Sequence, residues 1–295
     1  MHSVRPFGGS WTEQKLTTLQ SYLVAYRRIF TRNINARWFN TIYVDAFAGT
    51  GNWENTDLSE LQTSLTLGGD KEAQSYAKGS VRVALELDEP FDNYIFIEKN
   101  GAFAGELKSV ISDYPNLEGQ TTVKVGDANT QIKQWLKSVD WSKNRAVVFL
   151  DPWGMQVDWE TVKMLGDTKG VDLWYLFPLG QGVNRLLTKT RMPTSGNAAK
   201  LTSIFGTDNW KEEFYKESNQ TDLFGAFQPV LKDANFSSIS QFIVSRLNTI
   251  FAGVTQNPLP LRNSKNYPIF LLIFASANEK GSRVALRIAN NLLKG

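Results

Sequence analysis

The sequence has no cysteine and only one histidine, His2. Zinc sites, disulfides, thiol nucleophiles and Ser-His triads therefore lack their parts. We expect no bound metal, and we expect any group transfer to proceed directly, without a covalent intermediate on sulfur.

Long apolar runs are missing as well. The longest, Ile269 to Ala275, is far too short to span a bilayer, and Met1 to Trp11 has no apolar core of the signal-peptide kind. We therefore expect no membrane association and a soluble cytoplasmic protein. With 295 residues, 42% of them apolar, the chain can bury one large core.

The positive charge is only mildly clustered. A net charge of +3 and a pI near 8.9 permit a nucleic-acid partner, RNA or DNA, without requiring one. One group of basic residues comprises Arg185, Lys189 and Arg191, and a second comprises Arg262, Lys265, Arg283 and Arg287. Solvated faces and loops are the better explanation of the second group.

Short buried strands alternate with helical segments along most of the chain. The β-branched and aromatic runs that predict strands are 41–44, 94–97, 121–125, 146–150, 171–177, 251–256 and 269–276. Helical spacing occurs at 11–30, 34–39, 80–87, 102–111, 130–139, 159–165, 240–250 and 282–293, with Ser80 and Thr130 placed as caps. This alternation predicts an α/β, Rossmann-like fold with a seven-stranded, mostly parallel sheet and helices on both faces.

We expect a single domain, residues 1–295, in which three segments are added to the alternating strands and helices. Residues 1–40 form N-terminal helices. The polar residues 52–79 separate the first strand from its helix and are interpreted as a loop insertion, either a lid over the ligand crevice or a surface excursion. The aromatic-rich residues 190–235 form a small helical subdomain after the fifth strand, for a substrate or a partner.

The first strand runs into the loop Asp45-Ala46-Phe47-Ala48-Gly49-Thr50-Gly51. Gly49 and Gly51 can adopt backbone angles closed to other residues, so an adenosyl group can lie against the main chain of Phe47, Ala48 and these glycines. Asp45 would lie close to a cationic sulfonium or amino group. The loop lacks the third glycine of a dinucleotide fingerprint, and the chain has no Gly-Lys-Ser/Thr phosphate loop.

Acids follow four successive predicted strands, at Asp45, Glu98, Asp127 and Asp151. Ligands of an open parallel sheet bind beyond the carboxyl ends of its strands, so these side chains should converge on one crevice. Glu98, followed by Lys99, is placed to accept hydrogen bonds from two ribose hydroxyls. Asp127 would accept from the exocyclic amine of adenine, with the main chain at Ala128 beside the ring. A helix cap explains Asp127 well but Asp45 poorly, because the insertion separates Asp45 from the next helix.

The fourth strand ends in the turn Asp151-Pro152-Trp153-Gly154. Pro152 ends the strand and removes a donor, which leaves the Asp151 carboxylate free to accept from a target amine. Trp153 is either a stacking platform for a planar substrate or a core residue at a strand-ending turn. Arg185 would meet a phosphate of the substrate.

At these residues the chain resembles the three-Cys-motif partner (TcmP) family, which is grouped with S-adenosylmethionine-dependent methyltransferase-like folds. The resemblance covers most of the chain and runs through segments 11–16, 22–23, 45–51, 79–80, 84–86, 96–99, 149–154, 177–178 with Arg185, 205–207 with Trp210, and 271–276. The turn at Asp151 is also similar to the Asp-Pro-Pro-Tyr/Phe turn of nucleic-acid amino-methyltransferases. It departs from that pattern at Trp153 and Gly154.

The resemblance implies a Rossmann-like methyltransferase fold, S-adenosylmethionine as cofactor, and a protein partner that carries a three-Cys motif. Together with the strand-end acids, it predicts a methyltransferase acting on an amine of a nucleic acid or nucleotide, with Asp151, Pro152 and Trp153 at the catalytic position. Two alternatives stay open: a non-catalytic nucleoside-binding partner subunit, and an enzyme for a small-molecule amine.

Overall fold

The computed structural model describes residues 10–51, 79–217 and 230–294. The predicted insertion at 52–78 and residues 218–229 of the predicted subdomain lie outside the described residues.

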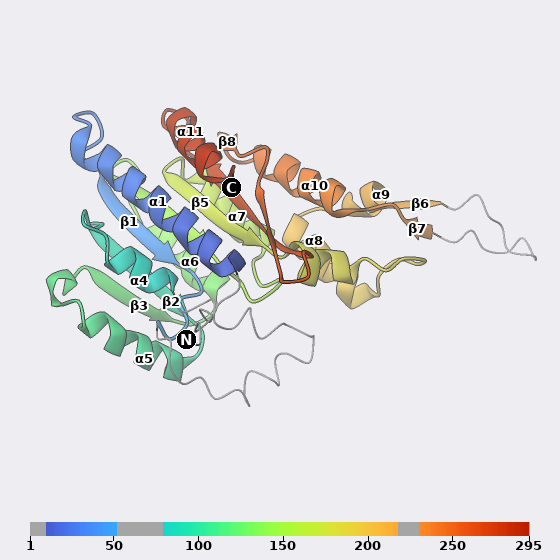
Figure 1. Cartoon of the computed structure of the whole chain (residues 1–295), viewed down its shortest axis with the longest axis horizontal. Helices are drawn as coiled ribbons and strands as arrows, with labels where there is room; N and C mark the ends of the chain where they lie inside the picture. The colour runs from blue at the N-terminus through green and yellow to red at the C-terminus, as the bar shows by residue number, and fades with distance from the viewer. Residues whose placement is uncertain (1–9, 52–78, 218–229, 295) are drawn as a thin grey trace, which may run out of the picture.

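Five parallel strands form the centre of the fold (Figure 1). They are β1 (Asn40–Asp45), β2 (Asn93–Glu98), β3 (Thr121–Val125), β4 (Asn144–Leu150) and β5 (Val171–Phe177). β10 (Pro268–Ser276) lies antiparallel to β5, and β8 (Gly253–Val254) pairs with β10. The resulting order, β3-β2-β1-β4-β5-β10-β8, is that of the Rossmann-like methyltransferase fold, so the predicted fold class is confirmed.

An eighth strand, β9 (Leu259–Arg262), also pairs with β10, where the sequence predicts only a loop. Pro260 argued against a strand, because proline cannot donate to a sheet ladder. Leu261 is nevertheless fully buried, and within the described residues β9 pairs with β10 alone. Proline is tolerated in a strand that forms an edge.

Helices cover both faces of the sheet. One face holds α1 (Ser10–Arg32), α4 (Ser80–Leu85), α5 (Gly101–Ser112) and α11 (Ser282–Leu292); the other holds α6 (Ala128–Ser138), α7 (Trp159–Asp167) and α10 (Phe236–Asn248). Alternate strand residues supply the two cores, so Val44 packs with the α6–α7 side and Tyr43 with the α1 side. None of these helices, among the residues described, combines the length and apolarity needed to cross a bilayer.

A smaller unit extends from the β5 side of the sheet (Figure 1). It comprises α8 (Ser195–Phe205), α9 (Trp210–Phe214) and an antiparallel ribbon of β6 (Tyr215–Glu217) and β7 (Val230–Lys232). Buried Phe205, Trp210 and Phe214 join the core on the α7 and α10 side. Among its described residues, the predicted helical subdomain at 190–235 is helical at α8 and α9 and forms strands at β6 and β7.

Three local predictions are wrong. Residues 34–39 form turns rather than a helix and leave Ile34 and Trp38 largely exposed, because no apolar layer lies against them. The N-caps of α4 and α6 are Gly79 and Asp127, in place of Ser80 and Thr130.

Candidate functional site

The four predicted acids lie at, or just after, the ends of strands that end at the same edge of the sheet. Asp45, the last residue of β1, is in register with Phe96 of β2 and with Phe149 of β4. On the two strands that flank β1, Glu98 therefore lies two residues beyond the partner of Asp45 in β2, and Asp151 lies two residues beyond its partner in β4. Asp127 follows Val125 of β3 by two residues, and Val125 pairs with Glu98, so the expected placement at the carboxyl edge is present for all four acids.

Hydrogen bonds tie the neighbouring loops to Glu98. Its Oε2 accepts from the Gly49 amide at 3.0 Å, and its Oε1 accepts from the Asn100 amide at 2.7 Å. The Gly126 amide donates to the Glu98 carbonyl at 3.0 Å, which places Asp127 on the adjoining loop. The half-buried Glu98 carboxylate can accept further hydrogen bonds, because an ionised carboxylate offers about four lone-pair sites.

The loop after β1 has the backbone that its glycines predict. Gly49 and Gly51 have φ angles of 60° and 71°, in the left-handed region. A Cβ at Gly51 would lie 3.1 Å from Leu107 Cδ1 of α5, so the loop is also closely packed. Ala48 is fully buried, and Phe47 is half-buried.

Asp45 is fully buried with one carboxylate oxygen unused. Its Oδ1 accepts from the Phe47 amide at 3.1 Å, whereas Oδ2 has no hydrogen-bond partner among the described residues. Burial raises the pKa of Asp45 to about 7; the Asp151 charge adds to the rise, and Ser80, the Phe47 amide and Lys15 oppose it. The Ser80 hydroxyl acts here as a nearby dipole, since it does not meet hydrogen-bond geometry.

A buried lysine, which the sequence analysis missed, meets Asp151. Lys15 of α1 donates from Nζ to Asp151 Oδ2 at 2.7 Å, with side-chain exposures of 0% and 4%. Burial lowers the pKa of Lys15 to about 7 against the opposing effect of Asp151. Burial also raises the pKa of Asp151 to about 6, and Lys15 opposes that rise. Asp45, Asp151 and Lys15 thus form one buried electrostatic cluster.

This ion pair corrects the expectation of a free Asp151 carboxylate. Oδ2 is occupied by Lys15, while Oδ1 makes no hydrogen bond to the described residues. Pro152 is buried and Trp153 is 44% exposed, so the core interpretation of Trp153 is wrong. The indole is available at the surface beside a buried, ion-paired acid.

Asn129, at the start of α6, holds the loop that follows Trp153. Its Nδ2 donates to the Gln156 carbonyl at 2.8 Å. Its Oδ1 accepts from the Asp158 amide at 2.9 Å and from the Thr161 hydroxyl at 2.8 Å. This nearly buried side chain fixes the loop against two helices, and sequence reasoning had not singled it out.

The remaining predicted site residues lie outside the buried cluster of Asp45, Asp151 and Lys15. Asp127 is exposed and caps α6, accepting from the Thr130 amide at 3.0 Å. This is the helix-cap interpretation of Asp127 given in the sequence analysis. Lys99 is exposed and Ala128 is buried. Arg185 is exposed and directly follows η2 (Leu179–Asn184), a π-helical turn after β5. Within the described ranges, no three Asp, Glu or His side chains gather as a metal site requires.

A signal for Lys15 was present in the sequence. Lys15 precedes Leu19 by four residues and Tyr22 by seven, which places it on the apolar face of α1. A lysine at such a position must meet a buried acid or lose its charge. The sequence could not predict the partner of Lys15, because Asp151 lies 136 residues away along the chain.

No family model matches the chain, and no curated protein matches its sequence. Among solved structures, a Legionella pneumophila protein of family DUF519 is similar at a TM-score of 0.46 and 12% identity, over 99% of this chain and 92% of that one. Spermidine synthase in complex with AdoDATO gives 0.40 and 9%, over 91% of this chain and only 61% of the synthase. The N-terminal domain of EvdMO1 with SAH bound gives 0.34 and 8%, over 86% and 80%.

The chain is thus distantly similar in structure to proteins of the methyltransferase fold, and no specific family is shown. At these TM-scores the similarity decides neither activity nor substrate. The fold assignment rests on the sheet order, and function has to be argued from the carboxyl edge itself.

Proposed function

We propose that the protein is an S-adenosylmethionine-dependent methyltransferase that acts on an amine of a nucleic acid or nucleotide. The observation that carries this proposal is the cluster at the ends of β1 and β4. There, a fully buried Asp45, whose Oδ2 has no hydrogen-bond partner in the described part of the chain, lies beside Asp151, and Asp151 adjoins the exposed Trp153.

The residues present fit the cofactor. An unpartnered buried carboxylate oxygen is costly unless a ligand meets it, and a cationic sulfonium or ammonium group suits Asp45. Gly49 and Gly51 leave room for a nucleoside against the backbone, and Glu98 keeps acceptor capacity for ribose hydroxyls. Asp127, exposed on the next loop, would meet the adenine amine only through its free lone pairs. Bound there, S-adenosylmethionine would supply an activated methyl group.

The cofactor's methyl group would pass to the target amine, the sulfur would keep the electron pair of the S–C bond, and the product nitrogen would release its proton to solvent. Asp151 Oδ1 would accept a hydrogen bond from the amine and orient its lone pair. Lys15 supports this role because it opposes the rise that burial causes in the pKa of Asp151. Trp153 would stack on the ring that carries the amine.

Two measurements test the proposal. Calorimetry should detect binding of S-adenosylmethionine and of its demethylated product, and a blank result with both would remove the premise. Asp151→Asn should abolish methyl transfer while cofactor binding persists. The matched control is Asp172→Asn, a second buried acid on β5 that accepts from Tyr22 at 2.6 Å and has its pKa raised by burial to about 6. Equal turnover in Asp151→Asn and the control would refute the role of Asp151.

One observation favours the second candidate, a nucleoside-binding subunit without catalysis. The Lys15–Asp151 ion pair is buried, and such a pair can serve the structure alone. This candidate predicts cofactor binding without methyl transfer to any RNA, DNA or nucleotide, and retention by a protein partner that carries a three-Cys motif. A small-molecule enzyme would instead show no affinity for RNA or DNA at any salt concentration.

A further inference from the structure

Two long stretches of the chain contain no acidic residue. No Asp or Glu occurs between Asp172 and Asp208, or between Asp233 and Glu279. Over the whole chain, 29 acidic residues nearly balance 32 lysines and arginines. Two acid-free stretches of this length therefore mark a segregation of charge that the small net charge conceals.

The fold brings parts of these stretches together beside the carboxyl edge. Asn184 Nδ2 donates to the Tyr267 hydroxyl at 3.2 Å, which joins the end of η2 to the turn before β10. Lys232 Nζ donates to Asn184 Oδ1 at 2.6 Å, and the Lys232 amide donates to the Lys189 carbonyl at 2.9 Å. Segments that are distant in sequence thus form one continuous surface.

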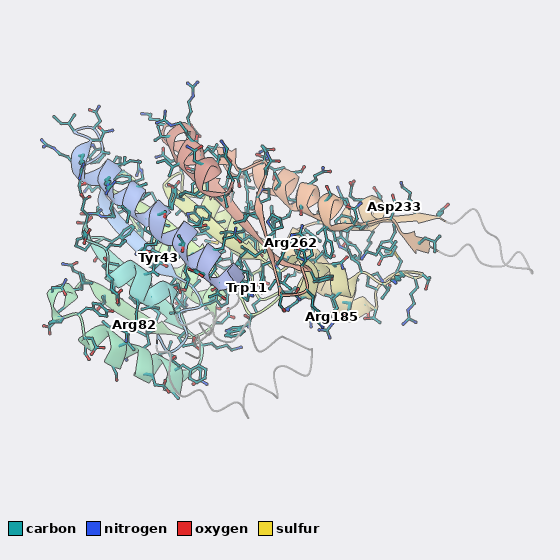
Figure 2. All side chains as sticks on the ribbon, viewed as in Figure 1. Trp11, Tyr43, Arg82, Arg185, Asp233 and Arg262 are labelled. Carbon is teal, nitrogen blue, oxygen red and sulfur yellow. The ribbon has the colours of Figure 1, made fainter. Side chains whose placement is uncertain are left out.

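We call this surface the basic face. It comprises Arg185, Lys189, Arg191, Lys232, Arg262 and Lys265. All but the half-buried Lys232 are exposed, and none forms an ion pair within the described ranges. Burial lowers the pKa of Lys232, and the charge of Lys189 lowers it further. Figure 2 shows Arg185 and Arg262 in the same region. Asp233, the residue after Lys232, is ion-paired with Lys216.

The basic face is continuous with the candidate site through η2. A Cβ at Gly182 would lie 3.1 Å from Met155 Cγ, on the loop after Trp153. A Cβ at Gly180 would clash with the Pro268 carbonyl at 2.1 Å, at the start of β10. Two exposed aromatic side chains flank this path, Trp153 at 44% and Tyr267 at 39%.

We propose that the basic face binds the phosphate backbone of a polymeric nucleic acid, and that the bound strand presents its base to Trp153. This inference rests on the proposed function and narrows its substrate class from nucleotide to polymer. A single phosphate can meet only one part of a face built from separate segments, whereas a backbone places phosphates along it. Aromatic rings beside cations are typical of surfaces that bind single strands through stacking and charge.

The test measures binding of a labelled single-stranded RNA and DNA of about 20 nucleotides by fluorescence anisotropy, between about 50 and 200 mM salt. Arg262→Gln/Lys265→Gln and Arg185→Gln/Lys189→Gln each remove two cations from the basic face. The matched control is Arg283→Gln/Arg287→Gln, which removes two exposed cations from α11, beyond the far end of β10. Circular dichroism checks that each variant is folded.

Each test variant should lose about tenfold or more in affinity at low salt. The slope of log affinity against log salt concentration should be shallower by about 1.4, since each of the two lost phosphate contacts contributes about 0.7 on single strands. The control should bind like wild type, and adenosine monophosphate should compete only weakly. Wild type that binds no oligonucleotide, or test variants indistinguishable from the control, would overturn the basic-face proposal. Oligonucleotide binding needs no cofactor, so the two proposals can fail separately. If the protein does not bind S-adenosylmethionine but the test variants still lose oligonucleotide affinity, the proposed function is refuted and the basic-face proposal is supported.

Discussion

Replacing Lys15 by methionine isolates the energetics of the buried cluster. Methionine preserves most of the side-chain volume on the apolar face of α1 but leaves Asp151 buried without the ammonium that contacts its Oδ2 at 2.7 Å. Breaking one side of a buried ion pair costs about 3–5 kcal/mol, because the remaining charge is uncompensated. Lys15→Met should therefore be among the most destabilising single changes in α1.

The pH dependence of that loss follows from Asp151. Lys15 opposes the rise of the Asp151 pKa, so its removal should push that pKa above the present value of about 6. Each further unit costs about 1.4 kcal/mol at a pH above the pKa that the carboxyl has in the folded protein. A raised acid pKa lowers stability as pH rises, so the loss should be large near pH 8. It should shrink toward pH 5, where the carboxyl is protonated in the folded protein at little cost.

Urea unfolding of Lys15→Met, Asp151→Asn and the double variant, each at about pH 5 and pH 8, measures these effects. The double variant should recover most of the stability, because no buried charge of the pair remains. Arg28→Met, at an exposed position of α1, serves as the control. A loss below about 1 kcal/mol in Lys15→Met that does not change between the two pH values would refute the reasoning.

Two further predictions concern the cofactor and the Trp153 loop. Affinity for S-adenosylmethionine should increase as pH rises toward 7, by up to about tenfold per unit, because a cationic ligand favours ionised Asp45 over its protonated form. Calorimetry of Asp45→Asn should give weaker binding that no longer varies with pH, and an unchanged pH profile would remove Asp45 from the site. Asn129→Ala should destabilise the protein by about 1–3 kcal/mol, because it leaves polar partners such as the Thr161 hydroxyl unpaired. It should also lower methyl transfer with cofactor affinity retained, and normal turnover would contradict the assigned positioning of the loop.

The sequence predicted the sheet well because its strands are local features. Val171 to Phe177 is an apolar run that is buried at every position, and its predicted and observed bounds agree. The acids that follow such runs reach one edge as a consequence of parallel topology, which alternation with helices already implies. Asp45, Glu98 and Asp151 could therefore be predicted together without knowledge of their contacts.

The errors come from properties that only the folded chain determines. Residues 34–39 have helical spacing, but Ile34 and Trp38 remain largely exposed, and the Trp38 ring stacks on that of its neighbour Phe39. Arg262 and Arg283 seemed to belong to one basic group, yet the nine residues of β10 separate the hairpin that carries Arg262 from the helix that carries Arg283. Spacing along the chain gave no information on these distances.

α1 holds two buried carboxylates at opposite ends of the sheet, and the contrast between them indicates which end binds a ligand. At the amino end, Tyr22 donates to Asp172, and the Ser276 hydroxyl and the charge of Arg145 also oppose the rise that burial causes in the pKa of Asp172. At the carboxyl end, α1 supplies a charged donor instead, and Asp45 still retains an oxygen without a partner among the described residues. Among the described residues, Lys15 is the lysine that meets this pair of acids, and a cation that arrives from outside would balance the second acid, which supports the cofactor position proposed above.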